Sequence, residues 1–446
     1  MKFVVIGGDA AGMSAASRAK RNQPDLDVTV LEQTEDVSYS ACGMPYNIAD
    51  PDRGLDDLVV RHAQEFHDKQ GIDLRTGHCV EKIEPSSKII SGKITQGDEF
   101  QLSYDKLLIA TGALPIIPQL PGFNLPGVLA LKSLEDGRKI KNFIAANNVK
   151  KAVIIGMGNI ALEMCESLRV RDIDVAMVKS RPILLPWMNE RLSGMVRQEL
   201  EANKIAIHDG HKIERIQQTD NGLKVVCADM ELEAKMVIVA IGVTPNSAIA
   251  KSAGLSINSD HSIAVDKTLL TSDEHIYAAG DCADAYHIVT GKKTWIPLAL
   301  RANRAGWAVA DNITGRKIEL EGIVGTAVFK VFDLQVARTG LTMSESKEAG
   351  FDPAEIMITS RSRAHSHPGN TTIGVQMIGD RNSGRLLGVQ MVGKEGVAHR
   401  INAPAVALHR KITVEEFSQC DLAYAPPFSP VWDPMLTAAN QLLKEM

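Results

Sequence analysis

The sequence predicts an α/β protein built on two Rossmann-like βαβ units, followed by a C-terminal α+β region. Two glycine-containing turns, at residues 7–12 and 156–161, each follow an apolar strand and precede a helical segment. Beyond residue 325, alternating segments such as 326–331 and 371–378 are typical of antiparallel strands instead. A chain of 446 residues exceeds one hydrophobic core, so we expect about three domains.

Composition narrows the classes of protein to which the chain can belong. The formal net charge of −5 gives no reason to expect nucleic acid or a membrane surface as a partner. No apolar run approaches the ~20 residues of a membrane span, and the N-terminus reads into a strand without a signal peptide. The six cysteines lack metal-binding spacing, so we expect no metal and a reducing, cytoplasmic compartment.

The first βαβ unit, residues 2–32, has the features of a dinucleotide site. Glycines let the backbone approach a pyrophosphate at a helix N-terminus, and an acid after the second strand can bind ribose hydroxyls. Asp9 replaces the middle glycine of the usual motif, so the order strand, turn, helix, strand and acid carries the prediction. The predicted ligands are Gly7, Gly8, Ala11, Gly12 and Glu32.

The second unit, starting at residue 151, repeats this order but lacks the acid. Its second strand, 174–178, is followed by Lys179 and Arg181. Because basic groups in this place accommodate the 2′-phosphate of NADP, the sequence favours NADPH, although both side chains also suit a solvated surface. The other predicted ligands of this unit are Gly156, Gly158, Asn159, Ile160 and, after the strand at 237–241, Gly242.

Two further strands end in small residues and favour a flavin together with a nicotinamide over a duplicated binding protein. The strand at 107–109 leads to Thr111 and Gly112, and a short strand at 276–279 leads to Gly280 and Asp281. An aspartate at a strand end lies where ligands meet parallel sheets, although it can equally cap the next helix.

Cys42 is an isolated thiol just after the first unit, without a CxxC or CxxxxC partner. Such a cysteine suits pairing with an external thiol, a sulfane sulfur or oxygen. Pro45 fits the first turn of a helix, and the positive end of that helix would favour the reactive thiolate. The alternative is a buried, inert cysteine.

These segments resemble the pyridine nucleotide-disulfide oxidoreductase family over essentially the whole chain. The resemblance implies that the first unit binds FAD and the second NAD(P)H, and that Asp281 binds the flavin ribityl chain. It also implies a discontinuous FAD-binding domain at 1–112 and 245–320, an NAD(P)H-binding domain at 113–244 and a C-terminal dimerisation domain at 325–446.

Within this family, Cys42 in its Ser-x-x-x-Cys-Gly-x-Pro-Tyr context is similar to the single-cysteine branch of coenzyme A-disulfide reductases, persulfide or sulfur reductases and NADH oxidases. The segment 423–430 is similar to that branch too, where a tyrosine, here Tyr424, reaches the cysteine of the partner subunit. The resemblance therefore implies a homodimer. Some relatives carry a C-terminal rhodanese domain, which we do not expect here because the chain ends at Met446.

Two departures from the branch bear on the substrate. Oxidases of this kind carry a histidine in the first glycine turn, where this chain has Asp9-Ala10-Ala11. Coenzyme A-disulfide reductases carry Tyr-Tyr-Pro-Gly in the C-terminal domain, and the matching region here is His365-Ser366-His367-Pro368-Gly369. We therefore expect His367 to replace the second tyrosine; both histidines also suit a solvated loop.

The resulting hypothesis is an FAD-dependent NAD(P)H oxidoreductase that reduces coenzyme A disulfide or low-molecular-weight persulfides. Its predicted catalytic residues are Cys42, Tyr424 and His367. An oxidase cycling Cys42 through a sulfenic acid and a flavoprotein redox sensor stay open. Coenzyme A phosphates need cationic partners, and relatives suggest the first helix and the Arg61 region. The predicted contacts are Ser14, Ser17, Arg18, Arg21, Ser38, Tyr39 and Arg61.

Overall fold

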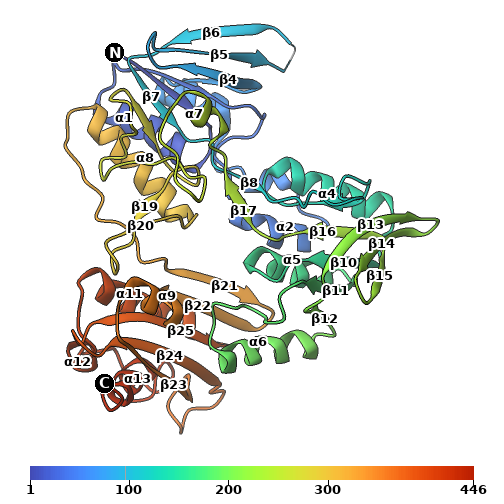
Figure 1. The fold of residues 1–446 in the computed structure, drawn as a ribbon, viewed down its shortest axis with the longest axis vertical. Helices are drawn as coiled ribbons and strands as arrows, with labels where there is room; N and C mark the ends of the chain where they lie inside the picture. Colours follow the sequence, from blue (N-terminus) through green and yellow to red (C-terminus); the bar gives the residue numbers. More distant parts are fainter. Residues whose placement is uncertain (96) are drawn as a thin grey trace.

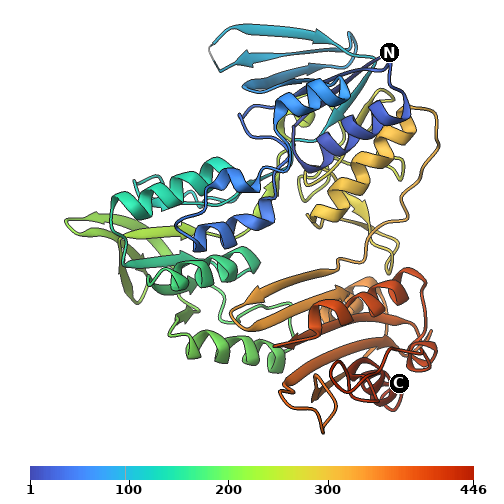
Figure 2. The same ribbon diagram turned by 180° about the vertical axis from the view of Figure 1, so that it is seen from behind.

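The computed structural model describes residues 1–95 and 97–446. Seen from two sides, the chain forms three bodies (Figures 1 and 2). The N-terminal segments and a later helix form one, the middle of the chain forms the second, and the C-terminal residues form the third. The α/β fold class, with two Rossmann-like units and a C-terminal α+β region, is confirmed.

The first body contains a five-stranded parallel sheet in the order β18-β7-β1-β2-β3. Residues 3–6 of the strand β1 are buried, as expected for a parallel strand covered on both faces. Helices α1 and α8 pack so closely that a Cβ at Gly306 of α8 would lie 2.2 Å from the carbonyl oxygen of Ala11 of α1. The elements are β1 (Lys2–Ile6), α1 (Ala10–Asn22), β2 (Asp27–Leu31), α3 (Ala63–Gln70), β3 (Asp73–Arg75), β7 (Lys106–Ile109), α7 (Ala248–Ser252), β18 (Ile276–Ala278) and α8 (Ala299–Ile313).

Smaller sheets complete this body. A three-stranded antiparallel sheet covers it, and a two-stranded hairpin precedes α8. Another antiparallel pair joins segments 113–115 and 243–245 where the chain passes between the first two bodies. These strands are β4 (His78–Glu84), β5 (Ile89–Ile94), β6 (Glu99–Ser103), β8 (Ala113–Pro115), β17 (Val243–Pro245), β19 (Ala285–Tyr286) and β20 (Lys293–Thr294).

The second body repeats the Rossmann-like plan with the parallel order β12-β11-β10-β16-β9 and adds an antiparallel sheet, β13-β14-β15. Helix α4 begins with a capping box formed by Ser133 and Asp136. The elements are β9 (Val128–Leu129), α4 (Leu134–Ala146), β10 (Lys151–Ile155), α5 (Asn159–Val170), β11 (Asp174–Lys179), α6 (Glu190–Ala202), β12 (Ala206–Asp209), β13 (Ile213–Thr219), β14 (Gly222–Cys227), β15 (Glu231–Ala234) and β16 (Met236–Val239).

One short segment crosses from the first body to the second. The helices around Cys42 follow β2 in the chain but lie beside α4 and α5 (Figure 1). Met44 and Ile48 belong to the same hydrophobic cluster as Leu134 of α4 and Leu162 of α5. The segment consists of η1 (Ala41–Gly43), α2 (Met44–Ala49) and η2 (Leu55–Leu58).

The third body is a five-stranded antiparallel sheet, in the order β21-β22-β25-β24-β23, packed with short helices. The predicted strands and the final helix are present within one or two residues. No described helix is long and apolar enough to cross a membrane. The elements are β21 (Ala327–Val331), β22 (Leu334–Gly340), α9 (Met343–Ala349), β23 (Pro353–Arg361), β24 (Thr372–Asp380), β25 (Leu386–Gly393), α10 (Val397–Arg400), α11 (Asn402–His409), α12 (Val414–Ser418) and α13 (Pro434–Leu442).

Candidate active site

The residues predicted for the first nucleotide meet at the carboxyl edge of the first parallel sheet. Ile6 at the end of β1 pairs in register with Leu31 and Ile109, and Ile109 pairs with Ala278. The segments after these strands therefore emerge side by side, where ligands of parallel sheets bind. They contain Gly7, Gly8, Ala11, Gly12, Glu32, Thr111, Gly112, Gly280 and Asp281.

The first turn has no room for a side chain at Gly7 or Gly12. Gly7 has φ +110°, and a Cβ there would lie 2.2 Å from the oxygen of Ala110. A Cβ at Gly12 would lie 1.9 Å from the oxygen of Gly7. The Gly8 N–H donates to Glu32 Oε2 at 2.8 Å, so the predicted acid folds back onto the turn. The turn thus brings backbone amides and a carboxylate together at the start of α1.

Three charged side chains surround the same edge. Asp9 lies in the turn, where burial raises its pKa to about 6 although Lys132 opposes the shift. Lys132 Nζ lies 3.4 Å from Asp281 Oδ2, and the Asp281 side chain is 22% exposed. The Trp295 indole N–H donates to the Asp281 carbonyl at 2.8 Å. Asp281 is therefore held at the strand end with its carboxylate partly open to solvent.

The second unit forms an equivalent edge, since Ile155 at the end of β10 pairs with Val178 and Val239. Gly156 has φ +119°, and a Cβ there would lie 2.2 Å from a neighbouring carbonyl oxygen. A Cβ at Gly158, the N-cap of α5, would meet no atom within 4 Å. The segments at this edge contain Gly156, Gly158, Asn159, Ile160, Lys179, Arg181 and Gly242.

The two basic residues after β11 differ in their surroundings. Lys179 Nζ donates to the Ile183 carbonyl at 2.7 Å, and burial lowers its pKa, with a smaller effect from Arg181. The Arg181 side chain is exposed. Lys179 is therefore tied to its own loop, and Arg181 is the more available cation for a 2′-phosphate.

Cys42 is exposed and lies in η1, immediately before α2. Pro45 lies in the first turn of α2, as predicted. Partial burial by the surrounding residues nevertheless raises the pKa of the Cys42 thiol. The charge of Glu163 adds to this shift, and that of Lys132 opposes it. The net pKa of the thiol is therefore raised, with burial as the largest cause. The helix α2 that follows has only six residues.

A tyrosine–carboxylate pair lies beside the thiol. The Tyr46 hydroxyl donates to Glu163 Oε1 at 2.9 Å, joining α2 to α5. Burial raises the pKa of Glu163, while the hydrogen bond from Tyr46 lowers it. Burial also raises the pKa of Tyr46, with Glu163 as the next cause. Sequence reasoning gave neither residue a role, because their pairing spans over a hundred positions and no local motif marks it.

The other predicted catalytic residues lie in the third body. Tyr424 is 48% exposed, and its loop is joined to the histidine loop by a hydrogen bond from the Ala364 N–H to the Pro426 carbonyl at 3.0 Å. His367 Nδ1 lies 3.0 Å from the Pro368 carbonyl oxygen. Within the described residues of this chain, neither side chain has a hydrogen bond to the segment around Cys42.

The predicted coenzyme A contacts differ in their surroundings. The Arg18 guanidinium pairs with the buried Asp311 at 2.7 Å and lies 5.2 Å from the ring centre of Trp307. Its charge is therefore already compensated. Ser17 is only 6% exposed, so its hydroxyl offers little surface to a ligand. Ser14 donates to Asn303 Oδ1 at 2.5 Å and is partly exposed, as are Ser38 and Tyr39; Arg21 and Arg61 are exposed.

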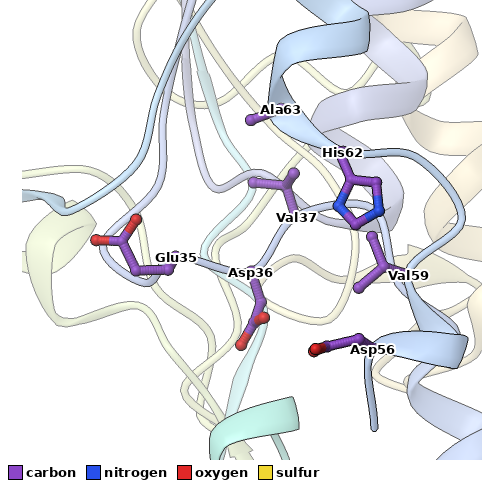
Figure 3. A pocket seen from close by; sticks show the side chains of 7 residues that line it. All are labelled: Glu35, Asp36, Val37, Asp56, Val59, His62 and Ala63. Carbon is purple, nitrogen blue, oxygen red and sulfur yellow. The ribbon is translucent and has the colours of Figure 1, made fainter. Parts of the chain in front are cut away.

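A cavity of about 200 Å³ adjoins the segment that carries Ser38, Tyr39 and Arg61 (Figure 3). Its acidic lining does not suit a phosphate, and Arg138 pairs at 2.7 Å with both Asp36 and Asp56. We therefore place no coenzyme A phosphate in it. The described residues contain no group of three potential metal ligands. The cavity is lined by Glu35, Asp36, Val37, Asp56, Val59, His62 and Ala63.

Comparison with known proteins places this geometry in a family. The model of the pyridine nucleotide-disulphide oxidoreductases matches residues 1–306, and the model of their dimerisation domain matches residues 326–435. The chain belongs to the pyridine nucleotide-disulphide oxidoreductase family. The predicted family, and with it the prediction of an oxidoreductase, is confirmed.

Relatives in this family have several activities. The chain is 37% identical to an NAD(P)H sulfur oxidoreductase (CoA-dependent) of Pyrococcus furiosus, over 99% of each chain. It is 33% identical to an NADH oxidase of Methanocaldococcus jannaschii, over 100% of this chain and 99% of that one. An NAD-dependent persulfide reductase from A. fulgidus has the same fold, with a TM-score of 0.96 and 36% identity, covering 100% of this chain and 83% of that one.

Proposed function

We propose that the protein uses NAD(P)H and FAD to reduce coenzyme A disulfide or coenzyme A and other low-molecular-weight persulfides, through Cys42. The observation that carries the proposal is an exposed, unpaired Cys42 within the electrostatic reach of Asp281 and Lys132 at the edge of the first dinucleotide unit. The CoA-dependent sulfur oxidoreductase and the persulfide reductase described above support the substrate class.

The residues at both edges fit the two cofactors. A Cβ at Gly112 or Gly158 would meet no atom within 4 Å, so each edge leaves open space beside a tight turn. Backbone amides at the starts of α1 and α5 suit pyrophosphates, and Glu32 and Asp281 suit the hydroxyls of FAD. For the second site we favour NADPH through Arg181, with NADH as a possible donor. Bound there, FAD would supply two-electron transfer between the nicotinamide and the oxidised sulfur.

Cys42 carries the sulfur chemistry. Its thiolate attacks one sulfur of the substrate, forms a mixed disulfide and expels the other sulfur as a thiolate, or as hydrosulfide from a persulfide. Two electrons and a proton then release the bound thiol and restore Cys42. Because only the thiolate attacks, the raised pKa of Cys42 slows this step.

The partner subunit completes this site in our proposal. Large apolar side chains are exposed along the segment that contains Tyr424, including Phe428 at 75% and Trp432 at 64%. Large apolar side chains exposed together on one segment favour an interface between copies of the chain. Tyr424 and His367 would then position the substrate sulfur or supply its proton, and Arg21 and Arg61 would bind coenzyme A phosphates.

A second candidate is an oxidase that reduces O2 through a Cys42 sulfenic acid, since one relative is an NADH oxidase. Asp9-Ala10-Ala11 in the first turn, without the histidine expected of such oxidases, argues against it.

The test compares the protein with Cys42→Ser and with Cys79→Ser, which removes another exposed cysteine. We expect NADPH-dependent reduction of coenzyme A disulfide or persulfide to be lost only in Cys42→Ser. Intact mass of the denatured protein should show a reductant-sensitive adduct on Cys42 after incubation with substrate. Oxygen consumption that exceeds sulfur reduction in the wild type would favour the oxidase instead.

A further inference from the structure

Helix α2, which follows Cys42, packs against the second body of the molecule. Although α2 follows the first nucleotide unit in the chain, its side chains Met44 and Ile48 pack in the core of the second body. Figure 1 shows α2 beside α4 and α5. The position of the thiol therefore depends on helices that belong to the other nucleotide site.

One face of α5 holds α2 by polar contacts. Glu163, Ser167 and Arg171 are spaced four residues apart, so they lie on one side of the helix and its C-cap. The Ser167 hydroxyl, 3% exposed, donates to the Pro45 carbonyl at 2.6 Å. Arg171 donates to the Ile48 carbonyl at 3.1 Å. Together with the contact of Glu163 to the tyrosine hydroxyl, this stripe contacts three positions of α2.

Lys141 of α4 secures the other end of α2. Its ammonium group donates to the carbonyl of Asn47 at 3.2 Å, to that of Asp50 at 2.7 Å and to that of Arg53. These acceptors lie at and beyond the C-terminal end of α2, where a cation is favoured by the helix dipole. Lys141 therefore stabilises the end of α2 from a second helix of the same body.

The stripe lies on the helix that begins at the second nucleotide turn. Gly158 is the N-cap of α5, so the first turn of α5 faces the proposed pyrophosphate and the following turns contact α2. An α-helix of twelve residues is a rigid rod about 18 Å long. A displacement at its N-terminus is therefore transmitted to the carbonyls that it holds.

We propose that Glu163, Ser167 and Arg171 are positioning residues that couple nucleotide occupancy at α5 to the reactivity of Cys42. The inference rests on the proposed function only in that the second unit binds a nicotinamide nucleotide. Bound nucleotide fixes α5, and with it the Tyr46–Glu163 pair beside the thiol. Because this carboxylate disfavours the thiolate, occupancy of the second site slows attack by Cys42 on small electrophiles.

The experiment measures alkylation of Cys42 by iodoacetamide in the flavin-loaded protein, quantified by peptide mass, with and without saturating NADP+. Saturation is established for each variant by equilibrium titration, with NAD+ as a second nucleotide. Arg171→Met and Ser167→Ala break the stripe. Arg169→Met is the matched control, since Arg169 bonds to the Ile173 carbonyl at 3.2 Å and to Asp174, not to α2.

We expect NADP+ to slow alkylation about fivefold or more in the wild type and in Arg169→Met, within the usual range of coupling between sites. In Arg171→Met and Ser167→Ala the ratio should fall below about twofold while NADP+ still binds, and Arg171→Lys should restore part of it. Equal rates with and without bound nucleotide overturn the inference, and so does full protection in both stripe variants, which indicates direct shielding. Absence of binding of either nucleotide to the wild type overturns the proposed function as well.

Discussion

Gly158→Ala separates nucleotide binding from folding at the second turn. Gly158 has φ −86°, which alanine adopts freely, and a Cβ there would meet no atom within 4 Å. Alanine is a poorer N-cap than glycine, so we expect a loss in the free energy of unfolding below about 1 kcal/mol. The methyl group would, however, occupy the space through which a pyrophosphate approaches the backbone. Losing one hydrogen bond to a charged group costs about 1.5–3 kcal/mol, which raises the Kd of NADPH about 10- to 150-fold.

Gly156→Ala provides the contrast within the same turn. Gly156 has φ +119°, and a Cβ there would lie 2.2 Å from the carbonyl oxygen of Ala240. The alanine variant should therefore lose at least about 2 kcal/mol of the free energy of unfolding. Thermal denaturation and fluorescence titration with NADPH measure the two effects. If Gly158→Ala binds NADPH as tightly as the wild type, the nucleotide does not approach this turn. If its Tm falls as far as that of Gly156→Ala, the space beside Gly158 is not open.

Further predictions concern charge. Glu163→Gln should speed alkylation of Cys42 and move the midpoint of its pH profile to lower pH, because the carboxylate raises the pKa of the thiol; an unchanged profile contradicts this. Arg18→Met should destabilise the fold by about 2 kcal/mol, since it leaves the buried Asp311 carboxylate with weaker partners, whereas Arg21→Met at an exposed site should leave the Tm nearly unchanged. Arg18 lowers the pKa of Asp311, so its stabilisation is present above the usual carboxyl pKa and is lost as the pH falls through the lowered folded value. The difference in Tm between wild type and Arg18→Met should therefore narrow in acid, and a constant difference would contradict the pairing.

Local patterns in the sequence were sufficient to predict the two Rossmann-like units. Each turn lies between a buried strand and a helix within about thirty residues, so the chemistry of the turn and its structural context are neighbours in the chain. Registers such as Ile6 with Ile109 then bring distant strand ends to one edge. The meeting of these strand ends could be predicted from the sequence, because the carboxyl ends of parallel strands lie at the same edge of a sheet.

The surroundings of Cys42 could not be predicted in the same way. The prediction of a helix at Pro45 is confirmed, but the sign of the net pKa shift depends on burial and on Glu163, more than a hundred residues away. The ion pair of Arg18 could not be predicted either, since its helical spacing suggests a free cation and its partner Asp311 comes from α8. Pairings between remote helices have no local signal.

Helix α2 packs with the second unit, so Cys42 is linked to both nucleotide units. By chain order Cys42 belongs with the first nucleotide unit, yet the carbonyls behind it are held by Lys141, Ser167 and Arg171 of the second. The thiol is therefore linked to both units, because hydrogen bonds from α4 and α5 hold the backbone that follows it, while its sulfur lies within the field of Asp281 and Lys132. The reactivity of Cys42 therefore depends on how the second unit holds α2 as well as on the charges at the edge of the first unit.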